Sequence, residues 1–290
     1  GVSGSSGGFD YSLGVSRDQS DGFDARTSAV AHNPDKDDYR QTAGNLRLGL
    51  QINPSQRIEG TLLESQMNSG YDDFFYNPAA PVDDRNKYRL RAAGLNWSSQ
   101  WTDVWRTKLQ VTDSSNRYET TPNFYKTETQ IRDYLFQNEF RFGPHLITAD
   151  LERREDSLNN AATAFSPTLD RERSQNALAL GYAFTQGAHT LQLNARHDDD
   201  SEFGGKNTGS VAYGYAFTPA WRATVSAGTS FRAPTLYQRF SEYGVASLQP
   251  EEGTNYEAGL RWTPQPASSL SLTAYHNKVK NLIDFDYLST

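Results

Sequence analysis

Residues 45–53 read Asn-Leu-Arg-Leu-Gly-Leu-Gln-Ile-Asn, and this stretch decides the fold class. Leu46, Leu48, Leu50 and Ile52 alternate with polar or small residues, so a β-strand would place all four on one face. A compact Asn-Pro-Ser-Gln connection follows at 53–56, and the same two-residue period returns at 105–111, 178–184 and 211–217. The stretch therefore predicts one hairpin in a series of antiparallel hairpins.

The connections between these segments fall into two classes that alternate along the chain. The tight ones lie at 53–56, 143–145, 186–189, 218–220 and 264–269, and the long polar ones at 24–37, 68–85, 119–126, 158–170 and 233–252. All tight turns should then lie at one end of the strands, which is typical of outer-membrane barrels with short periplasmic turns and long extracellular loops. Aromatic residues, which favour a membrane–water boundary, gather near the tight turns: Trp101, Trp105, Phe142, Phe184, Phe217, Trp221 and Trp262.

Composition supports this prediction. The mean hydropathy is -0.74, and no apolar run approaches the ~20 residues of a spanning helix, whereas a barrel exposes only alternate residues to lipid. The chain has no cysteine, and its net charge of -7 argues against a nucleic-acid partner. We predict an all-β fold, an antiparallel transmembrane β-barrel domain over 1–290. A soluble β-protein with an aromatic core is the alternative.

The expected strands number about 13, which is odd, whereas closed bacterial barrels have even numbers. The chain begins at Gly1 without a signal peptide and has Met67 as its single methionine, so we expect a piece of a longer barrel. One strand is irregular, because the apolar residues switch from Leu90 and Ala92 to Leu95 and Trp97. Either a β-bulge or a misplaced strand boundary would explain the switch.

The segment 230–262 carries a longer motif. It reads Ser-Phe-Arg-Ala-Pro-Thr-Leu from Ser230, Leu-Gln-Pro-Glu-Glu from Leu248 and Asn-Tyr-Glu-Ala-Gly-Leu from Asn255. This closely resembles a hallmark of TonB-dependent outer-membrane receptors, in which a strand ends in an Arg-Ala-Pro loop. Pro234 suits a strand end because it has no N–H for the ladder.

Within that family the chain is most similar to the cobalamin (vitamin B12) receptors. The similarity rests on Gly-Phe-Asp at 22–24, Asp-Lys-Asp at 35–37, Gly-Tyr-Asp at 70–72, Pro-Val-Asp-Asp-Arg at 81–85, the block 195–204 and the block 281–286. The resemblance implies a barrel of about 22 strands, of which this chain is an internal piece. It also implies an N-terminal plug and TonB box outside this chain, TonB and outer-membrane lipid as partners, and a monomer in the bacterial outer membrane.

The first two long loops hold the best candidate site. Ca²⁺ takes six to eight oxygen ligands, and the loops offer such oxygens from Asp24, Asn33, Asp35, Asp37, Tyr71, Asp72 and Asp83. On residue types alone a solvated acidic loop is the better interpretation. The resemblance reverses this, because the matching positions in cobalamin receptors bind two calcium ions that order the substrate-capturing loops. It also implies that Thr127 contacts substrate, although a threonine at a strand end is ordinary.

The other polar clusters give weaker indications of a functional site. The run His197-Asp198-Asp199-Asp200 cannot converge on a metal because consecutive strand residues face opposite sides, so a solvated rim is predicted. His145 and His189 lie in tight turns, and nothing in the spacing brings a nucleophile and base together. The chain is therefore predicted not to be an enzyme.

The function implied is TonB-dependent active transport of cobalamin, or of a similar scarce chelate, across the outer membrane. A ferric-siderophore or haem receptor of the same family is the nearest alternative, since it would share the 230–262 motif without needing paired acidic loops. A passive porin is the alternative from another class.

Overall fold

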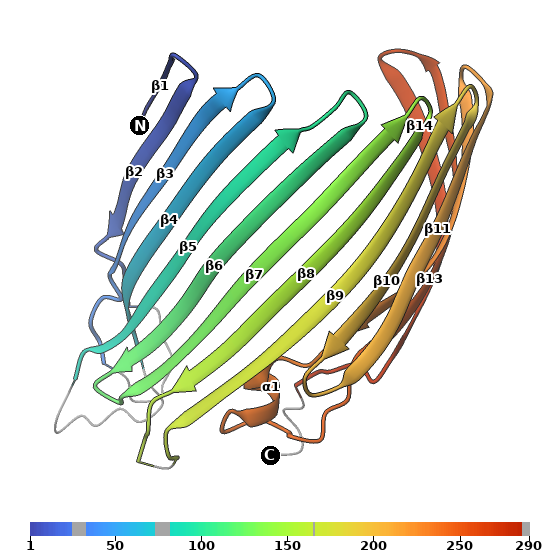
Figure 1. Ribbon diagram of the computed structural model, residues 1–290. Helices are drawn as coiled ribbons and strands as arrows, with labels where there is room; N and C mark the ends of the chain where they lie inside the picture. Colours follow the sequence, from blue (N-terminus) through green and yellow to red (C-terminus); the bar gives the residue numbers. More distant parts are fainter. Residues whose placement is uncertain (25–32, 73–81, 165, 286–290) are drawn as a thin grey trace. The chain divides into compact units, whose positions relative to one another are not determined.

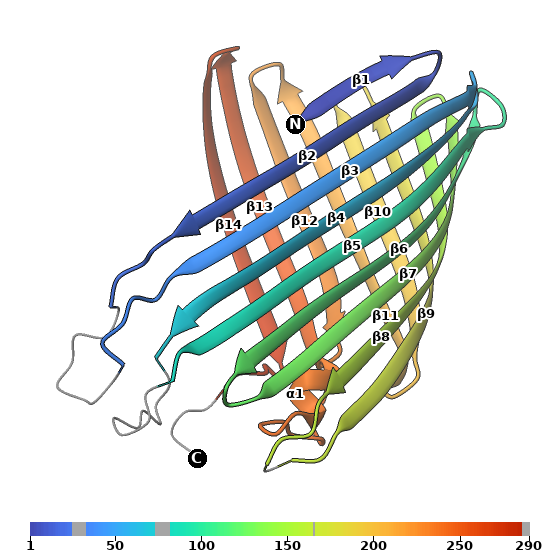
Figure 2. The same cartoon turned by 90° about the vertical axis from the view of Figure 1, so that its left-hand side faces the viewer.

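The computed structural model describes residues 1–24, 33–72, 82–164 and 166–285, which form antiparallel strands and one short helix (Figures 1 and 2). The elements in this part of the chain are β1 Val2–Ser6, β2 Phe9–Ser20, β3 Tyr39–Asn53, β4 Gln56–Tyr71, β5 Asp84–Gln100, β6 Trp105–Thr121, β7 Tyr125–Phe142, β8 His145–Asn160, β9 Leu169–Gln186, β10 His189–Asp200, β11 Gly204–Thr218, β12 Trp221–Arg232, α1 Leu236–Phe240, β13 Glu251–Gln265 and β14 Ser268–Lys280. Among the described residues, no helix is long and apolar enough to cross a membrane.

The strands follow one another in the sheet in the order of the sequence, from β1 to β14, so every hairpin partner is also a sheet neighbour. The tight connections are two-residue turns at 54–55, 143–144, 187–188, 219–220 and 266–267. Gly143 and Gly187 take positive φ angles of 56° and 58° there, which glycine adopts at no steric cost. The predicted hairpin series is confirmed.

The chain divides into two compact units. Unit 1 contains Gly1–Ser98, Gln110–Tyr134 and Arg154–Glu172, and unit 2 contains Ser99–Leu109, Leu135–Arg153 and Arg173–Thr290. In unit 1 the register places Leu46 opposite Leu13 and Leu62. The three side chains share one face, which we call the apolar face, while Arg47, Gly49 and Gln51 lie on the polar face.

The apolar face of unit 1 is exposed rather than buried. Leu13, Leu48, Leu50 and Leu62 are 43%, 40%, 46% and 38% exposed. Among the described residues of the whole chain, Leu158, Ala177 and Leu236 are the buried hydrophobic residues, far fewer than a soluble domain needs. A soluble protein with an aromatic core is excluded, and the transmembrane interpretation of the alternation accounts for the exposed leucines.

Unit 2 has the same two faces, because Leu193 lies opposite both Tyr182 and Val211. At its tight turns, aromatic side chains of neighbouring strands contact one another. Ring pairs 4.9–6.5 Å apart include Trp101–Trp105, Trp105–Phe140, His145–Phe184, His189–Tyr215, Tyr215–Phe217, Phe217–Trp221 and Trp221–Trp262. The predicted clustering of aromatic residues at the tight turns is therefore present in this unit.

The prediction of about 13 strands agrees with the fourteen that the described residues form; the additional strand is β1, whose Val-Ser-Gly-Ser-Ser sequence carries no apolar alternation. Two predicted loops, however, were wrong. The segment 119–126 is not a long loop, since β6 runs to Thr121 and β7 begins at Tyr125. The loop 158–170 is also shorter than predicted, because β8 extends to Asn160 and β9 begins at Leu169.

The irregular strand also needs correction. β5 runs unbroken from Asp84 to Gln100, and a Cβ on Gly94 would meet Thr61 and Thr112, both on the polar face. Leu90 and Ala92, two and four residues before Gly94, therefore lie on the polar face as well. The apolar face of β5 instead carries Leu95 and, before it, Lys87, Arg89 and Arg91. The sequence prediction missed this face because it followed the apolar residues alone.

Candidate functional site

The first acidic loop is closed by backbone contacts at its base. The Asp37 amide donates to the Phe23 carbonyl at 3.3 Å, so Asp24, which follows Phe23, begins the loop beside Asp37. Gly22 takes a φ of 64°, and any Cβ there would collide with the Asp37 carbonyl. Only glycine fits this crossing of the two chain segments.

Two further contacts bring the second acidic loop to the first. The Gly70 amide donates to the Asp38 carbonyl at 2.8 Å, which places Tyr71 and Asp72 next to the base of the first loop. Asn33 Nδ2 donates to Asp35 Oδ2 at 2.6 Å and to the Val82 carbonyl at 3.3 Å. The described parts of the two loops are therefore neighbours, as adjacent hairpins should be.

The raised pKa of Asp35 reflects the proximity of these carboxylates. Burial raises the pKa of Asp35, and the negative charges of Asp83, Asp37 and Asp72 raise the same pKa further, in that order. A carboxyl pKa rises in this way when like charges lie close enough to disfavour the ionised form. Three of the seven predicted ligands thus lie close enough to act on a fourth, Asp35.

The carboxylates lie near one another, but they are not arranged as a complete set of metal ligands. Among the described residues, no three His, Cys, Asp or Glu side chains are arranged so that they could hold a metal ion. Asp72 Oδ1 is buried and has no hydrogen-bond partner in the described part of the chain. A buried carboxylate oxygen of this kind needs a donor or a cation, so the donor chemistry fits Ca²⁺.

Arg85 supplies part of the missing positive charge. Its guanidinium lies 2.8 Å from Asp38 Oδ1 and 2.9 Å from Asp83 Oδ2, and it also donates to Asn68 Oδ1 at 2.9 Å. Arg85 therefore joins the start of β5 to both loops and holds Asp83. Sequence reasoning missed this residue because the predicted ligands were selected for oxygen atoms alone.

Thr127 lies three residues into β7, and its hydroxyl donates to Asn160 Oδ1 at 2.7 Å. Asn160 is 5% exposed and ends β8, so the pair lies at the loop ends of the two strands. The location agrees with the prediction that Thr127 lies near the mouth of a strand. A contact with substrate remains a prediction.

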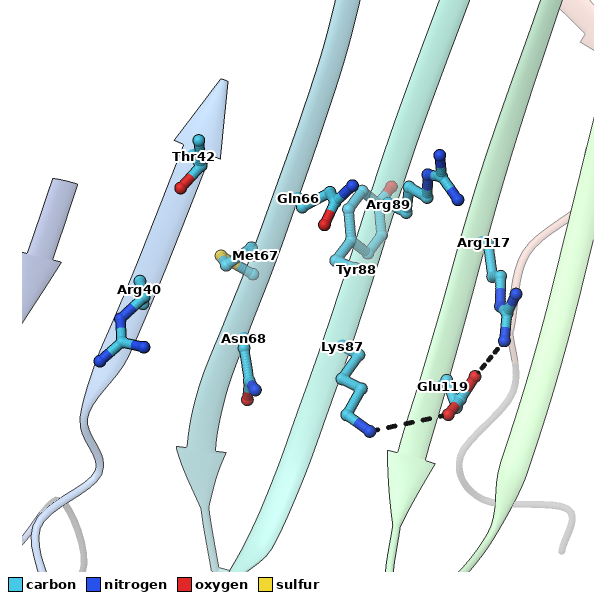
Figure 3. Close-up of a pocket in the computed structure, with 10 residues that line it drawn as sticks. All are labelled: Arg40, Thr42, Gln66, Met67, Asn68, Lys87, Tyr88, Arg89, Arg117 and Glu119. Carbon is cyan, nitrogen blue, oxygen red and sulfur yellow. Dashed lines mark hydrogen bonds and ion pairs between the residues drawn. The ribbon is translucent and has the colours of Figure 1, made fainter. Parts of the chain in front are cut away.

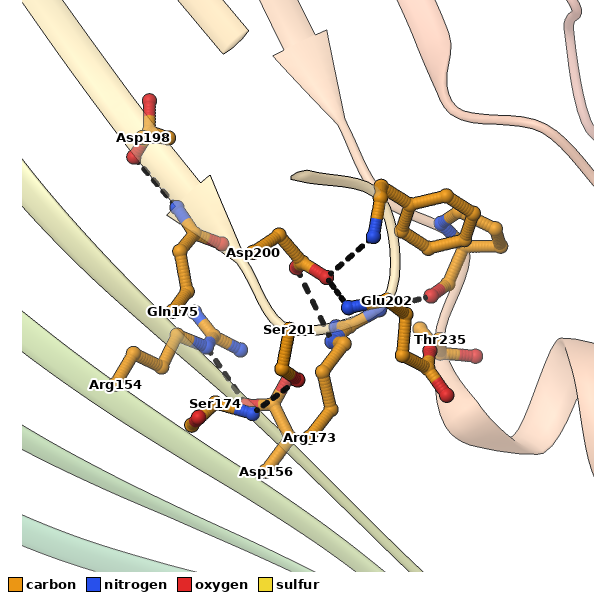
Figure 4. Close-up of polar contacts among 12 residues, drawn as sticks. Arg154, Asp156, Arg173, Ser174, Gln175, Asp198, Asp200, Ser201, Glu202 and Thr235 are labelled. Atoms are coloured by element: carbon orange, nitrogen blue, oxygen red, sulfur yellow. Dashed lines mark hydrogen bonds and ion pairs between the residues drawn. The ribbon is translucent and has the colours of Figure 1, made fainter. Parts of the chain in front are cut away.

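Half of the acidic run 197–200 is buried, which corrects the prediction of a solvated rim. Asp198 and Asp200 are 3% and 2% exposed and lie among polar side chains (Figure 4). They share one face of β10, while His197 and Asp199 lie on the other face and are exposed. Arg196 and Gln175 donate to Asp198 Oδ1 at 2.8 and 2.5 Å. Asp198 can be buried because Arg196 on its own strand and Gln175 on the neighbouring strand β9 supply a charged and an amide donor.

The second aspartate connects β10 to the Arg-Ala-Pro segment. The Arg173 guanidinium lies 3.6 Å from Asp200 Oδ2 and donates to the Pro234 carbonyl at 2.6 Å. Asp200 Oδ1 accepts from the Glu202 and Phe203 amides. We call Arg173, Asp200 and Pro234 the loop anchor.

The Arg-Ala-Pro motif ends β12 as predicted. Arg232 is the last residue of β12, and its guanidinium binds both carboxylate oxygens of Glu251, the first residue of β13, at 2.5 and 2.9 Å. Glu251 also accepts the Ile283 amide at 2.8 Å. The motif thus closes the base of the 233–250 connection, in which Thr235 caps α1.

Sequence comparison places these features among known proteins. The family described as TonB dependent receptor-like, beta-barrel matches residues 6–290. A vitamin B12 transporter BtuB from Photobacterium profundum is 25% identical over 273 residues, covering 93% of this chain and 44% of that protein. The BtuB of Vibrio cholerae is 34% identical over 129 residues, covering 41% of this chain and 20% of that protein. The chain spans less than half the length of these curated relatives.

Solved structures show the same fold at low identity. The ferric enterobactin receptor PfeA of Pseudomonas aeruginosa, as an R480A/Q482A mutant, superposes with a TM-score of 0.80 at 14% identity, over 96% of this chain and 49% of that one. The siderophore receptor PirA of the same organism gives 0.77 at 16% identity, over 96% and 51%. These likenesses concern the fold alone.

Proposed function

Because this chain belongs to the TonB-dependent receptor-like β-barrel family, we propose that it forms part of the barrel wall of an active transporter in the bacterial outer membrane. Members of this family are outer-membrane barrels and act as transporters rather than enzymes. The observation that carries the proposal is the family match over residues 6–290, together with exposed apolar rows along the strands.

The substrate proposed is cobalamin. Two curated relatives named as vitamin B12 transporters support this choice, and so does the acidic loop pair, which a siderophore receptor does not need. Asp24, Asn33, Asp35, Asp37, Tyr71, Asp72 and Asp83 would supply oxygen ligands to two calcium ions. Calcium would neutralise the mutual repulsion at Asp35 and satisfy the buried Asp72 oxygen, so the two loops would become ordered for substrate capture.

Transport itself would depend on partners outside this chain. A plug and its TonB box would receive energy from TonB, and the wall described here would hold the external loops and line the pathway. Thr127, on the polar face at the loop end of β7, would contact the substrate.

Binding of labelled cyanocobalamin by the native protein that carries this chain tests the proposal. We expect tight binding in the presence of Ca²⁺ and at least a tenfold loss after chelation. Binding of a ferric siderophore with no cobalamin binding would assign the chain to the rival receptor class. Steady single-channel conductance without TonB would instead support a passive porin.

A further inference from the structure

On the apolar face of unit 1, apolar side chains give way to charged ones at neighbouring positions of several strands. On β2 the face carries Leu13 and Val15 and then Arg17, and on β3 it carries Leu46 and then Arg40 beyond Thr42. The register places Arg17 opposite Thr42, so the change occurs at neighbouring positions of the two strands. Hydrocarbon-facing side chains end here, on the side of the long loops.

The same change occurs on the next strands. Glu64 follows Leu62 on the apolar face of β4, and the guanidinium of Arg89 on β5 lies 2.7 Å from its carboxylate, which puts Arg89 on that face. Two-residue steps add Lys87 and Arg91 beside Arg89, before Leu95. On β6, Leu109 and Val111 are followed on the same face by Arg117 and Glu119.

Five of the charged residues on this face, Arg40, Lys87, Arg89, Arg117 and Glu119, line a cleft of about 370 Å³ on unit 1 (Figure 3). Its lining includes four cations with one carboxylate, and the amides of Gln66 and Asn68 lie among them. We call Arg40, Lys87, Arg89 and Arg117 the basic cluster. The side chains of Lys87, Arg89 and Arg117 are 50%, 49% and 40% exposed, so their charged groups are accessible.

The basic cluster is not neutralised as the arginines of the polar face are. There, Arg47 and Arg57 each lie within 3.1 Å of both Asp10 and Glu59, which balances two cations with two anions. In the basic cluster, Arg89 pairs with Glu64, Lys87 and Arg117 share Glu119, and Arg40 has no ion-pair partner among the described residues. The four cations therefore face two carboxylates, which leaves an excess of positive charge that an anionic ligand can balance.

We infer that the basic cluster binds the phosphate groups of an anionic membrane lipid in the leaflet next to the long loops. The ligand must be amphiphilic, because the cations directly follow the apolar rows on the same face and adjoining strands. Guanidinium groups bind phosphate oxygens in bidentate fashion, and the neutral amide and hydroxyl groups of the cleft can donate to the remaining oxygens. This inference rests on the proposed membrane setting and adds a lipid site to it.

Titration of the native, detergent-solubilised protein with a bisphosphorylated glycolipid (lipid A), followed by native mass spectrometry, tests the inference. Arg40→Gln with Arg89→Gln should weaken binding about tenfold or more, since each basic residue near a lipid surface contributes appreciably. Arg40→Lys with Arg89→Lys keeps the charges but loses the bidentate geometry, so its affinity should lie between those of the wild type and the glutamine variant. Arg106→Gln with Lys108→Gln is the matched control. It removes the same charge from β6, but both residues lie on the face opposite to Leu109, so lipid binding should be unchanged.

Two results would overturn the inference. One is equal lipid A binding by wild type and the Arg40/Arg89 glutamine variant, which would leave the cleft to another kind of partner. The other is equal binding of lipid A and its dephosphorylated form. Cobalamin binding measured in parallel should be unchanged in the glutamine variant, so failure of the lipid site is distinguishable from failure of the transport proposal.

Discussion

At Gly49 on the polar face of β3, the absence of a side chain lets Arg57 reach across to Asp10. A Cβ at this position would collide with the guanidinium of Arg57 and lie 2.6 Å from a carboxylate oxygen of Asp10. The ion pair between Arg57 on β4 and Asp10 on β2, which crosses β3, therefore depends on this glycine. Gly60 offers a contrast, because a Cβ there would meet nothing within 4 Å.

Gly49→Ala should lower the free energy of unfolding by about 1–3 kcal/mol, because the added methyl forces Arg57 away from Asp10. Gly60→Ala on β4 is the matched control and should change stability little, or raise it by about 0.4–1 kcal/mol. Chemical unfolding of the detergent-refolded protein measures both. Equal effects of the two substitutions would show that Arg57 does not need the gap at Gly49.

Asp35→Asn should weaken Ca²⁺ binding by about tenfold, since affinity follows the charge count of the ligands. Because the pKa of Asp35 lies above its ordinary value near 3.8, protons should compete with Ca²⁺ at higher pH than for an unperturbed aspartate. Affinity should therefore fall as the pH decreases through that raised pKa, and fall less steeply in Asp35→Asn. Asp21→Asn, in the same connection, is the control. Isothermal titration calorimetry measures both, and equal losses in the two variants would contradict the assignment.

At the scale of elements, the strands of unit 2 are joined by a charged pair at the long-loop ends and by aromatic contacts at the tight-turn ends. The loop anchor joins β9 to β10 and to the segment after β12, with Arg173 8% and Asp200 0% exposed at the side chain. The aromatic contacts at the tight turns join strands through rings that remain partly exposed.

Arg173→Met should destabilise the protein by about 3–5 kcal/mol, because it leaves the buried Asp200 charge without its cation. Adding Asp200→Asn should recover part of the loss. Arg141→Met is the control. The Arg141 side chain is 61% exposed and pairs with Glu139, so its loss should lower the free energy of unfolding by about 0–1 kcal/mol. Chemical unfolding would refute the loop anchor if Arg173→Met and Arg141→Met were equally mild.

The tryptophans of the tight turns should lie at the membrane–water boundary. In a protein whose other tryptophans, Trp97 included, are replaced by phenylalanine, the fluorescence of Trp101, Trp105, Trp221 and Trp262 should be quenched more by headgroup-proximal nitroxide lipids than by probes at the end of the acyl chain. Stronger quenching by the deep probe would place these rings in the hydrocarbon and contradict the interface assignment.

At the scale of the whole molecule, the alternation at 45–53 predicted the fold because a two-residue period with tight turns has few other solutions. The sequence did not reveal β1, since Gly and Ser carry no alternation, nor the burial of Asp198 and Asp200, which depends in part on Gln175 and Arg173 of the neighbouring strand β9. The acidic site could be predicted from oxygen-bearing loops, but Arg85 and the basic cluster could not. Leu90 and Ala92 suggested the wrong face for β5.

The absence of cysteine from this chain allows the most direct test of the central claim, that the leucine rows face lipid. Single cysteines from 45 to 52, in a native protein free of other cysteines, would carry nitroxide labels in a bilayer. Collision with oxygen should peak at 46, 48 and 50, and collision with a water-soluble nickel complex at 47, 49 and 51. A profile without this two-residue alternation, or with the opposite phase, would contradict the membrane-spanning wall.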